Sequence, residues 1–261
     1  MKIFACFLFC ELLQAHDLYL LPAKFHVQKG VTLRVAFHNG DAFPASEVAP
    51  KVLRLLEPSI TGAAGVVAIL NLKEQGKETL GEATINAEGA LIVSVRTAPN
   101  FIELEPKKFE EYLKEEGLDE VLAWRKEHGE ASRPGRERYS KYAKSLVQSK
   151  VSDAFFRHQM NFPIEIVPLA DPYTAKPGSQ LPVQVFFRGK PAQGMQLEVA
   201  WADGVESKTT IAGRTDSDGR INVAILKKGL WRLHTLKMEH CADQKTADWE
   251  SFWASLTFEI R

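Results

Sequence analysis

The sequence predicts a mainly β protein made of two antiparallel β-sandwich domains with a short helical insertion between them. Three observations predict this fold class: short segments of alternating apolar residues, turn-forming breaks between them, and one charge-rich stretch with helical spacing. Short alternating segments separated by glycine, proline and asparagine are typical of antiparallel sandwiches. A chain of 261 residues is long enough for two such domains with ordinary cores.

The strand pattern is clearest in residues 31–38, "VTLRVAFH", where apolar side chains occupy every second position from Val31 to Phe37. This period of two predicts a strand with one buried face. The segments "LIVSVRT", "LPVQVFF", "MQLEVAW", "INVAIL" and "SLTFEI" have the same character, and breaks such as "FRGKPAQG" and "TDSDG" separate them.

Residues 105–152 form the exception and are predicted to be helical. Pro106 suits the first position of a helix, and Gly117 and Gly129 suit the ends of two consecutive short helices. The segment is dense in charges of both signs, which is typical of a solvated helical layer lying against the sheets. A third helix is predicted from one apolar stripe made by Tyr139, Tyr142, Ala143 and Leu146.

The N-terminus reads as a secretion signal covering residues 1–15. Lys2 precedes an apolar run of eight residues, and a short polar stretch then ends in the small residue Ala15. The run is too short to span a bilayer, and the alternative is a buried N-terminal strand. Cleavage after Ala15 would make His16 the new N-terminus of a periplasmic or secreted protein. The predicted organisation is then an N-terminal sandwich over 16–104, the insertion over 105–152 and a C-terminal sandwich over 153–261.

Charge and cysteine content narrow the function classes. Lys and Arg together equal Asp and Glu in number, 33 of each, so the chain lacks the basic excess that nucleic acid or anionic lipid requires. We therefore expect no nucleic-acid partner and no direct membrane insertion after signal cleavage. Two of the three cysteines, Cys6 and Cys10, lie in the predicted signal. Cys241 alone would remain, which excludes an intramolecular disulfide.

The familiar catalytic signatures are absent from the sequence. There is no G-x-S-x-G, H-E-x-x-H, C-x-x-C, P-loop or G-x-G-x-x-G pattern. "TDSDG" has the alternating aspartates of a calcium loop, but not the glycine and glutamate positions that an EF-hand requires, so we interpret it as a turn. No nucleophile, base and orienting group can be assembled from spacing, and we expect a non-enzyme.

The histidines carry the strongest indication of function. A free His16 would offer its α-amino group and its imidazole to one metal ion. If residues 18–27 and 31–38 pair as a hairpin, the numbers of opposed residues sum to about 58, which places Asp41 across from Asp17 and His38 across from Leu20. His38 and Asp41 would then approach the new N-terminus.

His234 lies on a predicted strand that also carries Met238 and His240. Imidazole suits nickel, cobalt, copper and zinc, and thioether suits Cu(I). We predict a metal site formed by His16, His38 and His234, with Asp17 or Asp41 orienting an imidazole. His128 is assigned to a helix end instead.

Several segments resemble a secreted bacterial family of unknown function that is often described as a periplasmic component of nickel or cobalt uptake. They include "AHDLYLLPAKF", "FHNGDAFP", "ELEPKKFEEYLKEEGLDEVLAWR", "RERYSKYAKSL", "PVQVFFRGKP", "GLWRLHTLKM" and "ADWESFWASLTFEI". The resemblance implies an immunoglobulin-like sandwich followed by one similar to carboxypeptidase-regulatory or transthyretin-like domains. It also implies a histidine at the mature start and a metal-uptake membrane transporter as partner.

Three functions are carried forward. The first is non-catalytic binding of a divalent transition metal, nickel or cobalt, in support of uptake. The second is periplasmic copper binding through the N-terminal histidine. The third is a structural or carbohydrate-binding module, in which tryptophans would form a stacking surface; the candidates are Trp201, Trp231, Trp249 and Trp253.

Overall fold

The structure is a computed structural model that describes residues 16–150 and 153–261. The predicted signal peptide and its cleavage therefore lie outside the described residues. Within these residues, no helix combines the length and the apolar character needed to cross a membrane.

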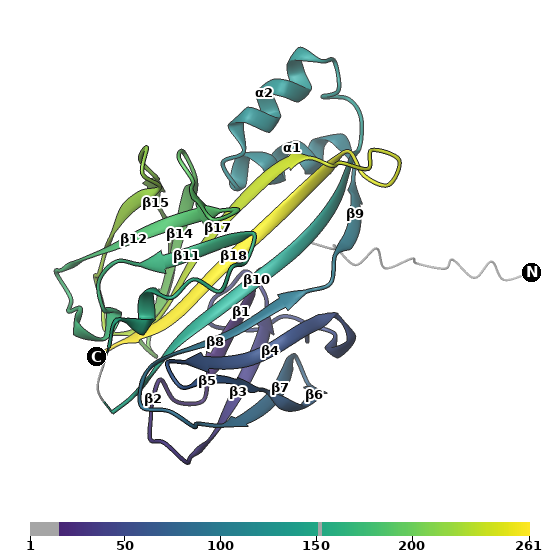
Figure 1. Ribbon diagram of the computed structural model, residues 1–261. Helices are drawn as coiled ribbons and strands as arrows, with labels where there is room; N and C mark the ends of the chain where they lie inside the picture. The colour runs from purple at the N-terminus through teal and green to yellow at the C-terminus, as the bar shows by residue number, and fades with distance from the viewer. Residues whose placement is uncertain (1–15, 151–152) are drawn as a thin grey trace, which may run out of the picture.

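Three sheets make up the fold (Figure 1). A small N-terminal sheet has the order β1-β3-β7-β6, and a small C-terminal sheet contains β11, β12, β13 and β16. The long sheet between them has the order β15-β14-β17-β18-β10-β8-β4-β5, with β2 and β9 also paired to β10. The small N-terminal sheet comprises β1 (Leu18–Pro22), β3 (Thr32–Asn39), β6 (Leu70–Gln75) and β7 (Glu78–Thr84). The small C-terminal sheet comprises β11 (Ile164–Pro168), β12 (Gln180–Phe187), β13 (Lys190–Pro191) and β16 (Arg220–Ala224). The long sheet and its attached strands comprise β2 (His26–Val27), β4 (Leu55–Gly62), β5 (Gly65–Ala68), β8 (Gly89–Thr97), β9 (Asn100–Leu104), β10 (Gly135–Ser149), β14 (Gln196–Ala202), β15 (Ser207–Arg214), β17 (Gly229–His240) and β18 (Trp249–Ile260).

The two small sheets cover opposite faces of the long sheet. Successive side chains of a strand point to opposite faces, and β10 divides accordingly between two hydrophobic cores. Tyr142 and Leu146 belong to the core beneath the C-terminal sheet. Ala143 and Val147 belong to the core beneath the N-terminal sheet. The protein is therefore two β-sandwiches that share one continuous sheet, which confirms the predicted mainly β, sandwich fold class and is consistent with an immunoglobulin-like fold.

The predicted third helix is wrong, because its residues form β10. This strand pairs in parallel with β18 and antiparallel with β8 and β9. Both faces of β10 are covered, so polar side chains such as Lys141 and Ser145 are also buried and the period of two disappears from the sequence. Among its described residues, 105–150, this segment is α-helical only in α1 (Pro106–Glu115) and α2 (Asp119–Glu127).

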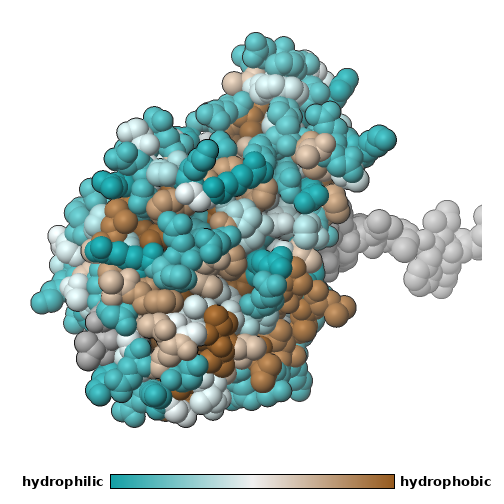
Figure 2. All heavy atoms as spheres, in the orientation of Figure 1, coloured by the Kyte–Doolittle hydropathy of each residue, from teal (hydrophilic) through white to brown (hydrophobic). Residues whose placement is uncertain are grey.

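The two helices lie at one end of the long strands β10, β17 and β18 (Figure 1). They pack on a separate apolar cluster that includes Phe109 and Leu113 of α1, Val121 of α2, and Trp249 and Trp253 of β18. Their outer surface, at the top of Figure 2, is mostly hydrophilic. The predicted solvated helical layer is thus present over α1 and α2.

Cys241 is buried just after β17. Because Cys6 and Cys10 lie in the predicted signal, we expect reductant to leave the thermal midpoint of the mature protein unchanged. Thermal denaturation with and without dithiothreitol measures this. A clear drop in the midpoint would reveal a bridge between two chains through Cys241.

Candidate metal centre

The β1–β3 hairpin brings the start of the described chain beside the loop that follows β3. Tyr19 lies opposite His38, and the Gly40 amide donates to the Asp17 carbonyl oxygen at 3.0 Å. Opposed residue numbers thus sum to 57, one less than predicted. This shift places His16, and not Asp17, opposite Asp41.

Three side chains meet at this point, and we call them the N-terminal site: His16, Asp41 and Glu47. Nδ1 of His16 lies 3.2 Å from Oδ2 of Asp41 and 3.6 Å from Oε2 of Glu47. One ligand atom from each residue lies within 4.8 Å of the other two. Among the described residues, this is the one group of three side chains with spacing suited to a metal ion. The donors are an imidazole and two carboxylates, which suit a divalent transition metal.

A tight loop holds Glu47 in place. Its Oε1 accepts a hydrogen bond from the Asp41 amide at 3.0 Å. This bond, the largest influence on the group, lowers the pKa of the Glu47 carboxyl and so favours its charged form. Gly40 permits the tight turn, because a Cβ there would lie only 2.8 Å from the Ala45 carbonyl oxygen. Glu47 was not among the predicted site residues, although "NGDAFPASE" does place a second acidic residue six positions after Asp41.

His38 is not part of this group. Its ring packs against Tyr19, with centroids 5.2 Å apart, and its Nε2 lies 4.0 Å from a Glu78 carboxylate oxygen. Burial lowers the pKa of His38, so the ring is neutral at pH 7. The prediction was that His38 approaches His16; the structure instead packs the His38 ring against Tyr19 within the hairpin.

His234 is likewise held elsewhere. It is 3% exposed, its Nδ1 lies 3.0 Å from Oδ1 of Asp17, and its Nε2 lies 3.1 Å from Oε2 of Glu116. Burial alone would lower the pKa of this imidazole, but the carboxylates of Asp17 and Glu116 raise it to about 9. The protonated ring donates through both nitrogens, one to Asp17 and one to Glu116. The predicted set of three histidines therefore does not assemble.

Arg232 lies beside His234 on the same face of β17 and completes a buried set of charges. It is 1% exposed, with Nη1 2.9 Å from Oδ2 of Asp17 and Nη2 2.6 Å from Oε1 of Glu198. Nη1 also donates to the Gly40 carbonyl oxygen at 3.4 Å. We call this set the buried charge network; its members are Asp17, Glu116, Glu198, Arg232 and His234.

A third cation, Lys141 of β10, lies under the N-terminal site. Its Nζ donates to the His16 carbonyl oxygen and, at 3.2 Å, to Oδ1 of Asn39. Burial, the largest effect, lowers the pKa of Lys141 to about 8, so the amine still carries most of its charge at pH 7. No local pattern in the sequence indicates this role, because Lys141 lies 125 residues after His16.

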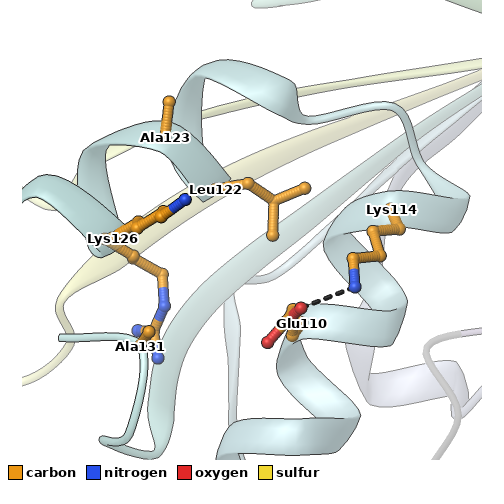
Figure 3. Close-up of a pocket in the computed structure, with 7 residues that line it drawn as sticks. Glu110, Lys114, Leu122, Ala123, Lys126 and Ala131 are labelled. Atoms are coloured by element: carbon orange, nitrogen blue, oxygen red, sulfur yellow. Dashed lines mark hydrogen bonds and ion pairs between the residues drawn. The ribbon is translucent and has the colours of Figure 1, made fainter.

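Other candidate features lie apart from this site. The four tryptophans proposed as a stacking surface are all buried, so they do not form one. Met238 packs in the apolar cluster under the helices. A hollow of about 240 Å³ lies between α1 and α2 (Figure 3), where Glu110 and Lys114 pair and Leu122 points toward α1. None of the predicted ligands lines this hollow.

Comparison with solved structures gives remote similarities. A crystal structure of a DUF4785 family protein from Legionella pneumophila is 12% identical, with a TM-score of 0.26, covering 83% of this chain and 51% of that chain. The Escherichia coli adhesin FdeC is 14% identical, with a TM-score of 0.27, covering 95% of this chain and 65% of that chain. The Yersinia pseudotuberculosis adhesin InvE is 12% identical, with a TM-score of 0.25, covering 93% and 58%. The chain thus spans about half to two thirds of the length of these proteins.

Comparison by sequence is more decisive. No curated protein matches the chain. A family model does match, from residue 13 to residue 239, which is most of the chain and includes the N-terminal site and the buried charge network. The protein belongs to the family described as domain of unknown function DUF4198.

Proposed function

We propose that this protein binds a divalent transition metal, nickel or cobalt, at the N-terminal site and does so without catalysis. The observation that supports this most is the meeting of His16, Asp41 and Glu47 at the position where signal cleavage would add a free α-amino group. An amine and an imidazole from His16 would close a chelate ring, and Asp41 and Glu47 would supply oxygens. Two carboxylates give the site a formal charge that one divalent cation neutralises.

The biological setting of the proposal is metal uptake outside the cytoplasm. The signal pattern before His16 supports a periplasmic or secreted location, and the family resemblance supports delivery to a metal-uptake membrane transporter. His16 and Asp41 lie at a partly exposed end of the hairpin, where an ion could enter and leave.

Copper is the second candidate, because the amine and imidazole of one residue also suit Cu(II). Copper lies at the top of the affinity order for nitrogen ligands, so tight copper binding in vitro would not by itself identify the metal. The two carboxylates and the distant Met238 disfavour Cu(I), which selects sulfur ligands. Competition among Ni(II), Co(II) and Cu(II) at equal free concentrations would rank them.

One residue added before His16 tests the proposal directly. We expect the extension to weaken Ni(II) binding by roughly tenfold or more, because the amine moves away while every side chain remains. Calorimetric titration of protein starting at His16 and of the extended form makes the comparison. Sequencing of exported protein should begin His-Asp-Leu-Tyr.

His128→Ala is the matched control, because it removes an imidazole that stacks on Trp124 and bonds to the helix end. It should leave Ni(II) affinity unchanged. Equal affinities for the mature and extended forms would remove the α-amino group from the site. No measurable affinity in either form would overturn the proposed function.

A further inference from the structure

We propose that Arg232 and His234 are positioning residues for the N-terminal site, acting through Asp17 and Gly40. The inference rests on the proposed function and deepens it. Neither residue hydrogen-bonds to His16, Asp41 or Glu47. Arg232 contacts the Gly40 carbonyl oxygen and the Asp17 carboxylate, and His234 contacts the Asp17 carboxylate, so both act on residues that directly adjoin a ligand.

Arg232 joins the two strands of the hairpin one residue from the site. Its Nη1 contacts both the Asp17 carboxylate, at 2.9 Å, and the Gly40 carbonyl oxygen, at 3.4 Å. Asp17 directly follows His16, and Gly40 directly precedes Asp41. The Gly40 amide also donates to the Asp17 carbonyl oxygen. The guanidinium and this backbone hydrogen bond therefore join the same two residues, Asp17 and Gly40.

His234 fixes the other oxygen of Asp17. Arg232 contacts Oδ2 and His234 contacts Oδ1, so each oxygen of this buried carboxylate has a cationic partner. The His234 ring is held in turn by Glu116, at the C-terminal end of α1. Contacts on both ring nitrogens leave the imidazole a single orientation toward Asp17.

These contacts would lower the entropic cost of binding a metal at the N-terminal site. Terminal residues are usually poorly ordered unless other parts of the fold hold them. A backbone that is already fixed loses little conformational entropy when a ligand binds. Because the backbone of residues 17 and 40 is fixed, His16, Asp41 and Glu47 would lose mainly side-chain conformational entropy when they bind a metal ion.

A purely structural role for the network is the alternative, and it predicts a different result. In that case, any buried ion pair of similar strength would have the same effect on the site. The chain offers such a pair in Lys144 and Glu165, 2.7 Å apart and both buried. Lys144 is at an even position of β10 and so faces away from Lys141 and the N-terminal site.

The experiment compares His234→Gln with Lys144→Gln in the protein starting at His16. Hydrogen exchange of the Gly40 amide, measured by NMR without metal, reports whether the hairpin end is held. We expect His234→Gln to speed this exchange by roughly tenfold or more and to weaken Ni(II) binding by a similar factor. The visible absorption spectrum of bound Co(II) should also change. Lys144→Gln should alter none of these three readouts, even where it lowers the thermal midpoint.

Glu116→Gln is the second variant, because its side chain is partly exposed and its replacement is compatible with folding if His234→Gln is not. It should change the same readouts in the same direction by a smaller factor. Unchanged exchange and affinity in both variants would overturn the inference, as would equal effects from Lys144→Gln.

The two proposals fail in different ways. A wild-type protein without Ni(II) or Co(II) affinity overturns the proposed function. The Gly40 exchange rate needs no metal, so it would still show whether His234, with its partner Glu116, holds the hairpin end. Faster exchange with unchanged Ni(II) affinity would overturn positioning of the site while leaving metal binding intact.

Discussion

Replacing Arg232 with methionine is expected to lower the free energy of unfolding by about 3 to 5 kcal/mol. Methionine fills much of the same volume, but it leaves Asp17 with only His234 and leaves Glu198 without its guanidinium partner. Asp17 would then be partly uncompensated in a buried setting, and Glu198 in a partly exposed one. An unpaired buried charge costs far more than the pair contributes. Urea denaturation of the wild type and the variant measures the difference.

Arg220→Met is the control for this loss, because Arg220 is exposed and its nearest carboxylate oxygen, on Asp218, is 3.9 Å away. Exposed pairs of this kind contribute little to stability, so the control should unfold like the wild type. A loss for Arg232→Met no larger than that of the control would mean that water enters the buried charge network and solvates Asp17.

The second large effect is a loss of stability as the pH rises through the range in which His234 titrates. Its pKa is about 9 in the folded protein against an ordinary value of 6.5. The folded state therefore binds this proton more tightly than the unfolded state. The resulting stabilisation is complete below pH 6.5 and is lost as the pH rises through 9. The shift corresponds to a contribution on the order of 3 kcal/mol.

The measurement is urea denaturation at pH 6, 7.5 and 9 for the wild type and His234→Gln. Two other buried groups titrate nearby. Burial raises the pKa of Glu137 to about 7, so its contribution is lost between pH 4.5 and 7. Burial lowers the pKa of Lys141 to about 8, so its contribution increases with pH above that value. Both remain in the variant, and the difference between the two proteins isolates His234. A difference that stays constant with pH would contradict the prediction.

The strands that could be predicted from the sequence are those with one covered face. In β3, Leu33, Val35 and Phe37 are buried and alternate with more exposed neighbours, as expected. In β10, neighbours such as Tyr142 and Ala143 enter different cores, so the apolar positions imitate a helical stripe. Whether a strand has one or two covered faces depends on segments far along the chain, and local periodicity does not contain that information.

The hairpin was assumed from the sequence and is present, but the register expected for it was one residue off. The error of one residue arises between Pro22 and Thr32, where the chain leaves β1 and forms β2, which pairs with β10 before β3 begins. A detour of this kind sets the register by long-range pairing and not by a compact turn. As a result, Asp41 lies opposite His16 instead of Asp17, and this pairing forms the N-terminal site.

The nature of His234 was equally hidden in the sequence. The alternation of apolar residues correctly placed His234 on a strand. The same local sequence pattern is expected whether the imidazole binds a metal or lies between two carboxylates. The difference is made by Asp17 and Glu116, which lie 217 and 118 residues away from it in number. His16 could be singled out because its signal is local: a small residue at the end of an apolar leader pattern.

Two side chains of β18 that bond to the backbone of β1 also bear on the order of folding during synthesis. Ser255 donates to the Leu18 carbonyl oxygen and Thr257 to that of Leu20, so the first strand of the fold is completed by nearly the last residues of the chain. A nascent chain that has not yet supplied β18 holds β1 without these partners, and contacts of such high sequence separation form slowly. Until β18 is made, β1 can pair with β3, but its Leu18 and Leu20 carbonyl oxygens lack their hydroxyl donors. A chain truncated before β18 also lacks the pairing of β18 with β10 and β17, so we expect proteases to degrade it faster than the full chain.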